Sequence, residues 1–235
     1  MTSAERFYAR HYGHSLRVGA IQLAQYEAAM MQPGQRYSLP ARHFEAHPPH
    51  GKTLVEVGCG GAEALLLLAQ RYKFQALVGI DVALPDSAEI EGLCVLKGDL
   101  DQTWPIDSGS ADYLLAMMVI EHLYDPFHAF SEVARVLSPQ GIAFINLPLV
   151  TSLANRLRLA LGLLPQTSTK VADWFQRCEW DGGHLHYFSL PGIRRLARAS
   201  GLRVCDVRGV GRLSSLKTAL PQLLAAEITF SVCRA

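Results

Sequence analysis

Paired cysteines are missing from this sequence. Its five cysteines, Cys59, Cys94, Cys178, Cys205 and Cys233, are odd in number, and none forms a C-x-x-C pair with another. This argues against both a disulfide framework and a structural zinc site. The N-terminal residues also lack the apolar core of a secretory signal. The composition therefore predicts a protein of the reducing cytoplasm.

The sequence also lacks an excess of positive or negative charge. The chain has 22 basic and 21 acidic side chains, so its formal net charge is +1. Such a balance gives no global field that would attract nucleic acid or an anionic membrane surface. No apolar run approaches the roughly eighteen residues of a membrane-spanning helix. A partner must be recognised locally, and we expect a small molecule.

Glycine is concentrated in one informative stretch, Thr53–Glu63, which reads TLVEVGCGGAE. A β-branched run enters this glycine cluster and continues into a helical run, and Asp81 ends the next apolar run. Gly58, Gly60 and Gly61 lack a Cβ, so the turn can adopt positive φ and its backbone can approach a ligand. Asp81 would then accept hydrogen bonds from ribose hydroxyls. The pattern predicts a site for a nucleotide-like cofactor.

The acids around this turn decide between cofactors. A dinucleotide site places a third Gly or Ala where the helix packs on the strand and seats a pyrophosphate at the helix N-terminus. Here that position is Glu63, and Glu56 lies two residues before the first glycine. Two carboxylates repel a pyrophosphate but suit a ligand with an ammonium and a sulfonium group. The prediction is therefore S-adenosylmethionine, and a nicotinamide oxidoreductase is disfavoured.

Five informative segments follow one another along the chain: VEVGCGGAE, GIDV (Gly79–Val82), GDLD (Gly98–Asp101), ADYLLAMMVIEHLYDP (Ala111–Pro126) and LSPQGIAFINLP (Leu137–Pro148). Together they resemble the successive motifs of class I S-adenosylmethionine-dependent methyltransferases. The match covers roughly residues 50–150 in the correct order. Downstream, the stretch from NLPLVTSLANRLRLALGLLP to GGHLHYFSLPGIRRLARASGL is similar to the branch with MetW-type and related small-molecule methyltransferases. This looser resemblance does not fix a substrate.

The resemblance implies a role for each matching position. Around the methionine end of the cofactor it places Glu56, Gly58, Cys59, Gly60 and Gly61. It assigns the ribose hydroxyls to Asp81, the adenine face to Val82, the adenine edge to Asp99 and Leu100, and the sulfonium side to Met117. Asp99 has a competing interpretation as a turn-forming residue. Cys59 is expected to be a small residue tolerated in the turn, because nothing adjacent would lower its pKa.

The expected fold is α/β, with a Rossmann-like, mostly parallel sheet of seven strands. Strands are predicted at Thr53–Val57, Ala76–Ile80, Leu93–Lys97, Tyr113–Met117, Ile142–Leu147, Leu202–Val207 and Ile228–Cys233, and the resemblance makes the last one antiparallel. Helices are predicted at Ala62–Arg71, Phe127–Leu137, Thr151–Gly162 and Ser189–Ser200. Pro40–Gly51 is expected to be a connecting loop, and Val82–Gly92 a short crossover with little helix.

These elements divide the chain into four parts. Residues 1–50 form a helical leader and linker, with Ser3–Met31 as one or two helices, and residues 51–148 form the cofactor-binding core. Residues 149–188 form a lid inserted after the fifth strand, rich in aromatic residues such as Trp174, Phe175 and Trp180. Residues 189–235 complete the core. An insertion at this edge of a parallel sheet is where α/β enzymes select substrates.

Histidine supplies the candidate base. His122, in IEHL after the fourth strand, has a near-neutral ordinary pKa that suits proton abstraction from an acceptor. Its alternative role is only to shape the pocket. His184 and His186 alternate in HLHYF and would share a face if extended, where they could contact the acceptor or simply pack. Two histidines alone make an incomplete metal site, so we expect no metal.

The leading hypothesis is a methyltransferase acting on an oxygen or nitrogen of a small-molecule or carrier-linked metabolite. Nucleic-acid amino-methyltransferases usually have an Asn/Asp-Pro-Pro-aromatic motif after the fourth strand, and this chain has MMVIEH there. The alternative is a cofactor-binding partner protein of the same fold with little turnover of its own. The sequence leaves the acceptor, the methylated atom and the oligomeric state open.

Overall fold

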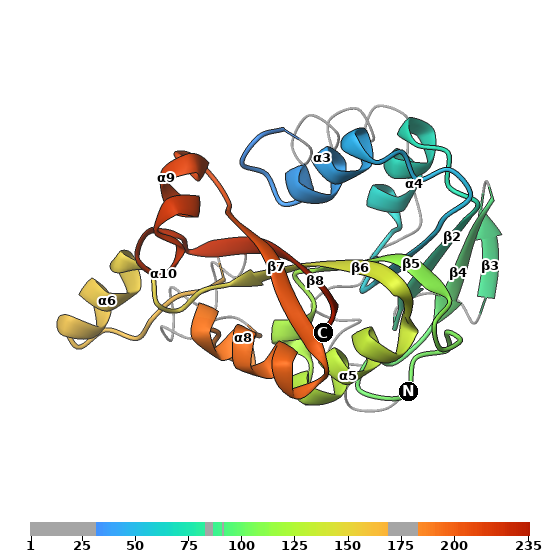
Figure 1. Cartoon of the computed structure of the whole chain (residues 1–235). Helices are drawn as coiled ribbons and strands as arrows, with labels where there is room; N and C mark the ends of the chain where they lie inside the picture. Colours follow the sequence, from blue (N-terminus) through green and yellow to red (C-terminus); the bar gives the residue numbers. More distant parts are fainter. Residues whose placement is uncertain (1–31, 83–86, 91, 169–182) are drawn as a thin grey trace.

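A computed structural model describes residues 32–82, 87–90, 92–168 and 183–235 of the chain (Figure 1). Its centre is an eight-stranded sheet in the order β3-β4-β2-β1-β5-β6-β8-β7. The strands are β1 (Thr53–Val57), β2 (Ala76–Asp81), β3 (Ser87–Ile90), β4 (Leu93–Lys97), β5 (Ala111–Met117), β6 (Leu137–Pro148), β7 (Leu202–Gly209) and β8 (Glu227–Arg234).

The strand directions confirm the predicted Rossmann-like sheet. Strand β1 runs parallel to β2 and β5, β2 runs parallel to β4, and β5 runs parallel to β6. The last strand, β8, is antiparallel to both of its neighbours, β6 and β7. All seven predicted strands are present. The carboxyl ends of the mutually parallel strands β1, β2, β4, β5 and β6 meet at one edge, where α/β proteins bind ligands.

The eighth strand, β3, was not predicted. It pairs antiparallel with β4, and Ile90 lies opposite Leu93, so only two residues join the strands. Gly92, with φ +82°, supplies the left-handed conformation that such a tight hairpin turn favours. The short crossover expected over Val82–Gly92 thus also contains an edge strand, which the sequence did not predict.

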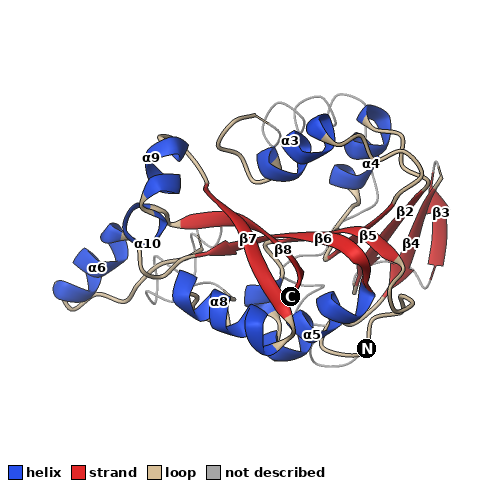
Figure 2. Cartoon of the chain, in the orientation of Figure 1, coloured by secondary structure: helices blue, strands red, loops and turns tan. Residues whose placement is uncertain are grey.

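Helices cover both faces of the sheet (Figure 2). On one face, α3 (Ser38–Ala46) and α4 (Glu63–Arg71) pack through Leu39, Phe44, Leu65 and Leu68 onto an apolar cluster that includes Leu54. The second cluster lies across the sheet and includes residues of α5 (Pro126–Val136) and α8 (Leu190–Ala199). Removing these side chains from water supplies most of the driving force for the three-layer arrangement.

Local signals explain where the helices begin. The Asp125 side chain accepts hydrogen bonds from the backbone N–H groups of Phe127 and His128, and Pro126 occupies the first turn of α5. Ser189 caps α8 in the same way, through the N–H of Gly192. Helix α3 contradicts the loop predicted over Pro40–Gly51. Proline is tolerated in the first turn of a helix, so Pro40 does not break it.

Three further helices complete the described chain: α6 (Leu153–Ala160), α9 (Ser214–Ala219) and α10 (Pro221–Leu224). Helix α6 lies within the predicted Thr151–Gly162, whereas α9 and α10 were not predicted. The predicted leader helices over Ser3–Met31, and the aromatic residues Trp174, Phe175 and Trp180, fall outside the described residues. No helix in the described ranges is long and apolar enough to cross a membrane.

Candidate active site

The glycine turn sits at the carboxyl end of β1, and its conformation needs glycine. Gly58 has φ +69° and Gly60 has φ +57°, a region that side chains rarely adopt. A Cβ on Gly58 would lie 2.5 Å from Cγ2 of Val119. The turn is therefore packed directly against the segment that follows β5.

Hydrogen bonds tie this turn to the end of β2. The backbone N–H groups of Gly58 and Cys59 both donate to the carbonyl oxygen of Ile80, at 2.8 and 3.1 Å. The N–H of Gly60 donates to Oδ2 of Asp81 at 2.9 Å. Asp81, predicted to hold the ribose, thus lies at the turn and also helps to shape it.

Glu56 is the most unusual group in the turn. Its side chain is buried, Oε1 accepts a hydrogen bond from the Tyr37 hydroxyl at 2.6 Å, and Oε2 has no hydrogen-bond partner among the described residues. Burial, together with the charges of Glu63 and Asp81, raises the pKa of Glu56 to about 8 against the opposing effect of the Tyr37 hydrogen bond. Three acids therefore gather at one turn, and an orphaned carboxylate oxygen suits a cationic ammonium group. The residues present fit S-adenosylmethionine.

The remaining predicted cofactor residues lie along the same edge of the sheet. Val82 follows β2, and Met117 ends β5 as a buried residue. Asp99 and Leu100 follow β4, where the Asp99 side chain accepts a hydrogen bond from the N–H of Asp101 at 3.0 Å. The turn-forming interpretation of Asp99 is thus present in the structure, and only one of its two carboxylate oxygens makes this contact.

Cys59 is buried, and burial raises the pKa of its thiol. A thiol that resists ionisation is a poor nucleophile. Its neighbourhood agrees with the expectation that Cys59 is a small residue held in the turn.

His122 lies in a short 3-10 helix, η1 (Ile120–His122), that directly follows β5. Its Nδ1 is 3.0 Å from the carbonyl oxygen of Gly183. A carbonyl can only accept, so Nδ1 carries the proton and Nε2 carries the lone pair. Burial lowers the pKa of His122, so the ring is neutral at pH 7. A neutral imidazole with a lone pair on Nε2 can accept a proton.

The two histidines of the predicted lid, His184 and His186, make different contacts. His184 makes an edge-to-face contact with the His122 ring, with 4.8 Å between ring centroids, and its Nδ1 is 2.6 Å from Oγ1 of Thr167. His186 instead places Nε2 3.1 Å from the carbonyl oxygen of Tyr124. The expectation that both share one face depended on an extended backbone. Only His184 reaches His122.

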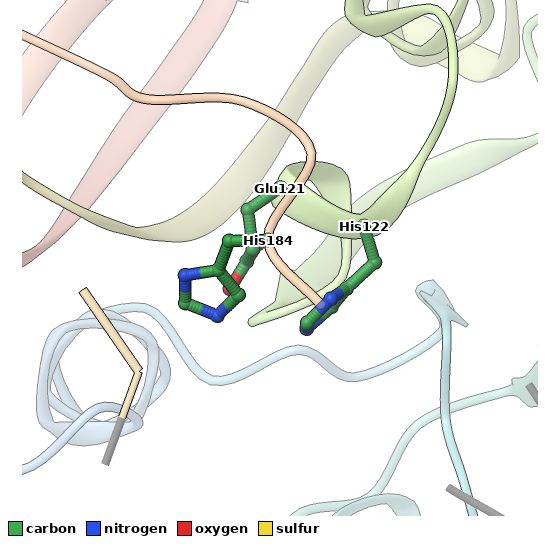
Figure 3. A group of neighbouring side chains, drawn as sticks. All are labelled: Glu121, His122 and His184. Carbon is green, nitrogen blue, oxygen red and sulfur yellow. The ribbon is translucent and has the colours of Figure 1, made fainter. Parts of the chain in front are cut away.

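Sequence reasoning missed Glu121, the residue next to His122. Its side chain is fully buried, and neither carboxylate oxygen has a hydrogen-bond partner in the part of the chain that the structure describes. Burial raises its pKa to about 8. Its side chain extends toward the His184 ring (Figure 3). The letters EH give no signal of which side chain the 3-10 turn directs inward.

A second missed group lies where β6 meets β8. Asn146 is buried, and its Nδ2 donates to Oε1 of Glu227 at 3.0 Å and to Oγ1 of Thr229 at 2.9 Å. Arg36 pairs with Glu227 through two hydrogen bonds, of 2.5 and 3.0 Å. These partners are separated by up to 191 residues, so only the fold reveals the network. This hydrogen-bond network holds the segment before α3 against the sheet.

Comparisons with known proteins agree with this geometry. A family model described as a methyltransferase domain matches residues 24–207. The ubiquinone biosynthesis O-methyltransferase of Neisseria meningitidis is 27% identical over 176 residues, covering 68% of this chain and 67% of that protein. The trans-aconitate 2-methyltransferase of Deinococcus radiodurans is 27% identical over 141 residues, covering 53% of each chain.

A solved structure shares the fold. An S-adenosylmethionine-dependent methyltransferase from Mesorhizobium loti has a TM-score of 0.58 at 16% identity, covering 83% of this chain and 96% of that one. The chain spans between 40% and 67% of the length of the curated relatives it matches. The family match covers most of the chain, from before α3 into β7. The chain therefore belongs to the methyltransferase-domain family.

Proposed function

We propose that this protein transfers a methyl group from S-adenosylmethionine to an oxygen or nitrogen of a small-molecule or carrier-linked metabolite. The observation that carries the proposal is the buried, unpartnered Oε2 of Glu56, set in a glycine turn lined by two further acids. Bound S-adenosylmethionine would supply the methyl group as an electrophile on a sulfonium. The residues of this chain bind it, orient the acceptor and accept the proton.

The cofactor's two ends have different partners. Glu56 would receive the ammonium group of the methionine end, beside the backbone of Gly58, Cys59, Gly60 and Gly61. Asp81 would hold the ribose hydroxyls with Oδ1, while Oδ2 stays on the N–H of Gly60. Val82, Asp99 and Leu100 would line the adenine, and Met117 the sulfonium side.

His122 would activate the acceptor. Its Gly183 contact leaves the lone pair on Nε2, and its lowered pKa keeps that lone pair unprotonated at neutral pH. Nε2 of His122 would take the proton of an acceptor that the site holds in line with the methyl group. Such a base contributes roughly a hundredfold or more to the rate.

The acceptor side is bounded by the segment that contains His184. The N–H groups of Leu185 and His186 both point at the carbonyl oxygen of Glu121, at 2.8 and 3.4 Å, which fixes this segment against η1. This contact supports the proposal that residues 149–188 act as a substrate lid, between the core of residues 51–148 and its completion in residues 189–235. The name of the Neisseria relative specifies methyl transfer to oxygen, so hydroxyl acceptors are the first class to test. Membership of the MetW-type branch and a cytoplasmic location stay predictions from the sequence.

The test begins with binding and ends with turnover. Calorimetry on the purified chain should show binding of S-adenosylmethionine and S-adenosylhomocysteine and none of NADH. Formation of S-adenosylhomocysteine is then followed with panels of phenols, carboxylic acids and amines. Micromolar NADH affinity without any response to S-adenosylmethionine would overturn the cofactor assignment. Binding without turnover, restored by a second protein, would favour the partner-protein alternative.

A further inference from the structure

Three potential metal ligands lie together beside the acceptor side of the site. Glu121, His122 and His184 each offer one ligand atom, and these atoms all lie within 4.8 Å of one another (Figure 3). They come from two segments, η1 and the loop that follows Gly183. The Leu185 N–H, at 2.8 Å from the carbonyl oxygen of Glu121, holds the two segments together.

The buried carboxyl group of Glu121 indicates that this cluster binds a cation. This carboxyl group is fully buried, and within the described residues both of its oxygens lack a hydrogen-bond partner. Buried carboxyl groups are normally paired with donors or bound to metal ions, because an unpaired one is expensive to bury. Arg36 acts on it only through its charge, and Glu227 opposes that effect. The residue's own backbone N–H also lowers the pKa of this carboxyl, but no side chain among the described residues donates a hydrogen bond to it.

The histidines are arranged as metal-binding histidines usually are. Such residues donate one ring N–H to a carbonyl or another acceptor, which fixes the tautomer and directs the other nitrogen at the metal. Nδ1 of His122 has the Gly183 carbonyl at 3.0 Å. Nδ1 of His184 has the Thr167 hydroxyl at 2.6 Å, and a hydroxyl can accept. In this tautomer both rings carry their lone pair on Nε2.

We propose that Glu121, His122 and His184 bind a divalent transition-metal ion of the zinc class, with one coordination position left for the methyl acceptor. Two histidines and one carboxylate are a ligand set of catalytic zinc sites, which keep a further position open. Metal–ligand distances of about 2.0–2.1 Å place tetrahedral ligand atoms roughly 3.3 Å apart. The widest pair therefore closes by up to about 1.5 Å on binding, which side-chain rotation can provide.

This inference rests on the proposed function and names its acceptor class, a hydroxyl compound that coordinates through oxygen. A metal ion lowers the pKa of a bound hydroxyl group, so the acceptor releases its proton to solvent water. The metal-bound oxygen then bonds to the methyl carbon as the carbon–sulfur bond breaks, and the sulfonium becomes a neutral thioether. A His122 lone pair that is bound to the metal cannot also accept a proton, so this inference replaces the His122 base of the proposed function with the metal and keeps the rest of that function.

Direct metal binding tests the site. Protein stripped with a chelator is titrated with zinc chloride by calorimetry, and with cobalt(II) while visible absorbance is recorded. We expect one equivalent of zinc, and a cobalt spectrum of tetrahedral intensity. Glu121→Gln and His184→Ala should each weaken zinc binding by about 100-fold or more, since even outer-shell changes reduce metal affinity by roughly 10–100-fold. His186→Ala is the matched control, because this histidine contacts Tyr124 instead, and its zinc affinity should be unchanged.

The outcomes separate the metal site from the proposed function. Absence of stoichiometric zinc binding, or equal binding by Glu121→Gln and His184→Ala proteins with native circular dichroism, refutes the metal site. Turnover that persists in excess chelator with the zinc-free protein also refutes its role and leaves the proposed function intact. Zinc binding in a protein that never binds S-adenosylmethionine does the reverse: the metal site stands and the proposed function fails.

Discussion

Protonation of Glu56 should control how tightly S-adenosylmethionine binds. In the unliganded protein burial raises the pKa of this carboxyl to about 8, so about 0.9 of the molecules carry a neutral Glu56 at pH 7. An ammonium group next to Oε2 favours the ionised form. Binding should therefore displace the proton.

The size of the effect follows from the fraction that is ionised. Apparent affinity scales with the population of the binding-competent form, which rises about ninefold between pH 6 and pH 7 for a pKa of about 8. The cofactor's own amine stays protonated in this interval, since α-amino groups have a pKa of about 8. Calorimetry in two buffers of different ionisation enthalpy should report release of about 0.9 proton at pH 7.

Two variants test whether protonation of Glu56 causes this pH dependence of the affinity. Glu56→Gln should make the affinity independent of pH between 6 and 7 and abolish the proton release. Tyr37→Phe removes the hydrogen bond that lowers the pKa of Glu56, so it should weaken binding at pH 7 while retaining the slope. A wild-type affinity that does not change between pH 6 and 7 would refute the reasoning, as would an equal proton release from Glu56→Gln.

Four further outcomes are expected. Without cofactor, stability should fall as pH rises from about 4.5 toward 8, because the folded state holds the Glu56 proton more tightly; Glu56→Gln should add up to about 3 kcal/mol at pH 7 in urea unfolding. Gly60→Val should abolish S-adenosylmethionine binding, since a β-branched residue disfavours φ +57°; tight binding by the folded variant would contradict this. Asp81→Ala should weaken cofactor binding by about 1.5–3 kcal/mol in calorimetry, and unchanged affinity would place the ribose elsewhere. The base role of His122 under the proposed function predicts that His122→Ala lowers kcat roughly a hundredfold and removes the acidic limb of the pH–rate profile, which lies below the ordinary pKa of His122; a limb that persists would assign it to another group.

Short, mainly apolar runs made strands such as β1 and β4 predictable. The predicted bounds of β1 and β4, Thr53–Val57 and Leu93–Lys97, are those of the structure, because such runs are long enough to be strands and too short for helices. Helix α3 was missed because Pro40 was interpreted as a loop residue. Its position in the first turn depends on where the helix begins, which no local signal marked: Tyr37 makes no side-chain cap.

The candidate site likewise contains some residues that the sequence predicts and others that it does not. Gly58, Gly60 and Asp81 have a local signature and meet as predicted, because successive carboxyl ends of parallel strands lie at one edge. Their assigned contacts with the cofactor stay predictions. The Tyr37 hydroxyl on Glu56, the inward direction of Glu121 and the Asn146–Glu227 contact each join residues whose relation only the fold establishes. No spacing rule reports which neighbour of His122 is buried.

The hydrogen bonds between the glycine turn and β2 also limit what this turn could become. A phosphate-binding loop needs backbone N–H groups that point at the anion. Here the N–H groups of Gly58 and Cys59 are committed to the Ile80 carbonyl, and that of Gly60 to Asp81. Neutralising the acids by Glu56→Gln and Glu63→Gln would remove repulsion without providing donors. Conversion to a dinucleotide site would thus require the release of these three N–H groups, so we expect the turn to disfavour phosphate through its conformation as well as its charge.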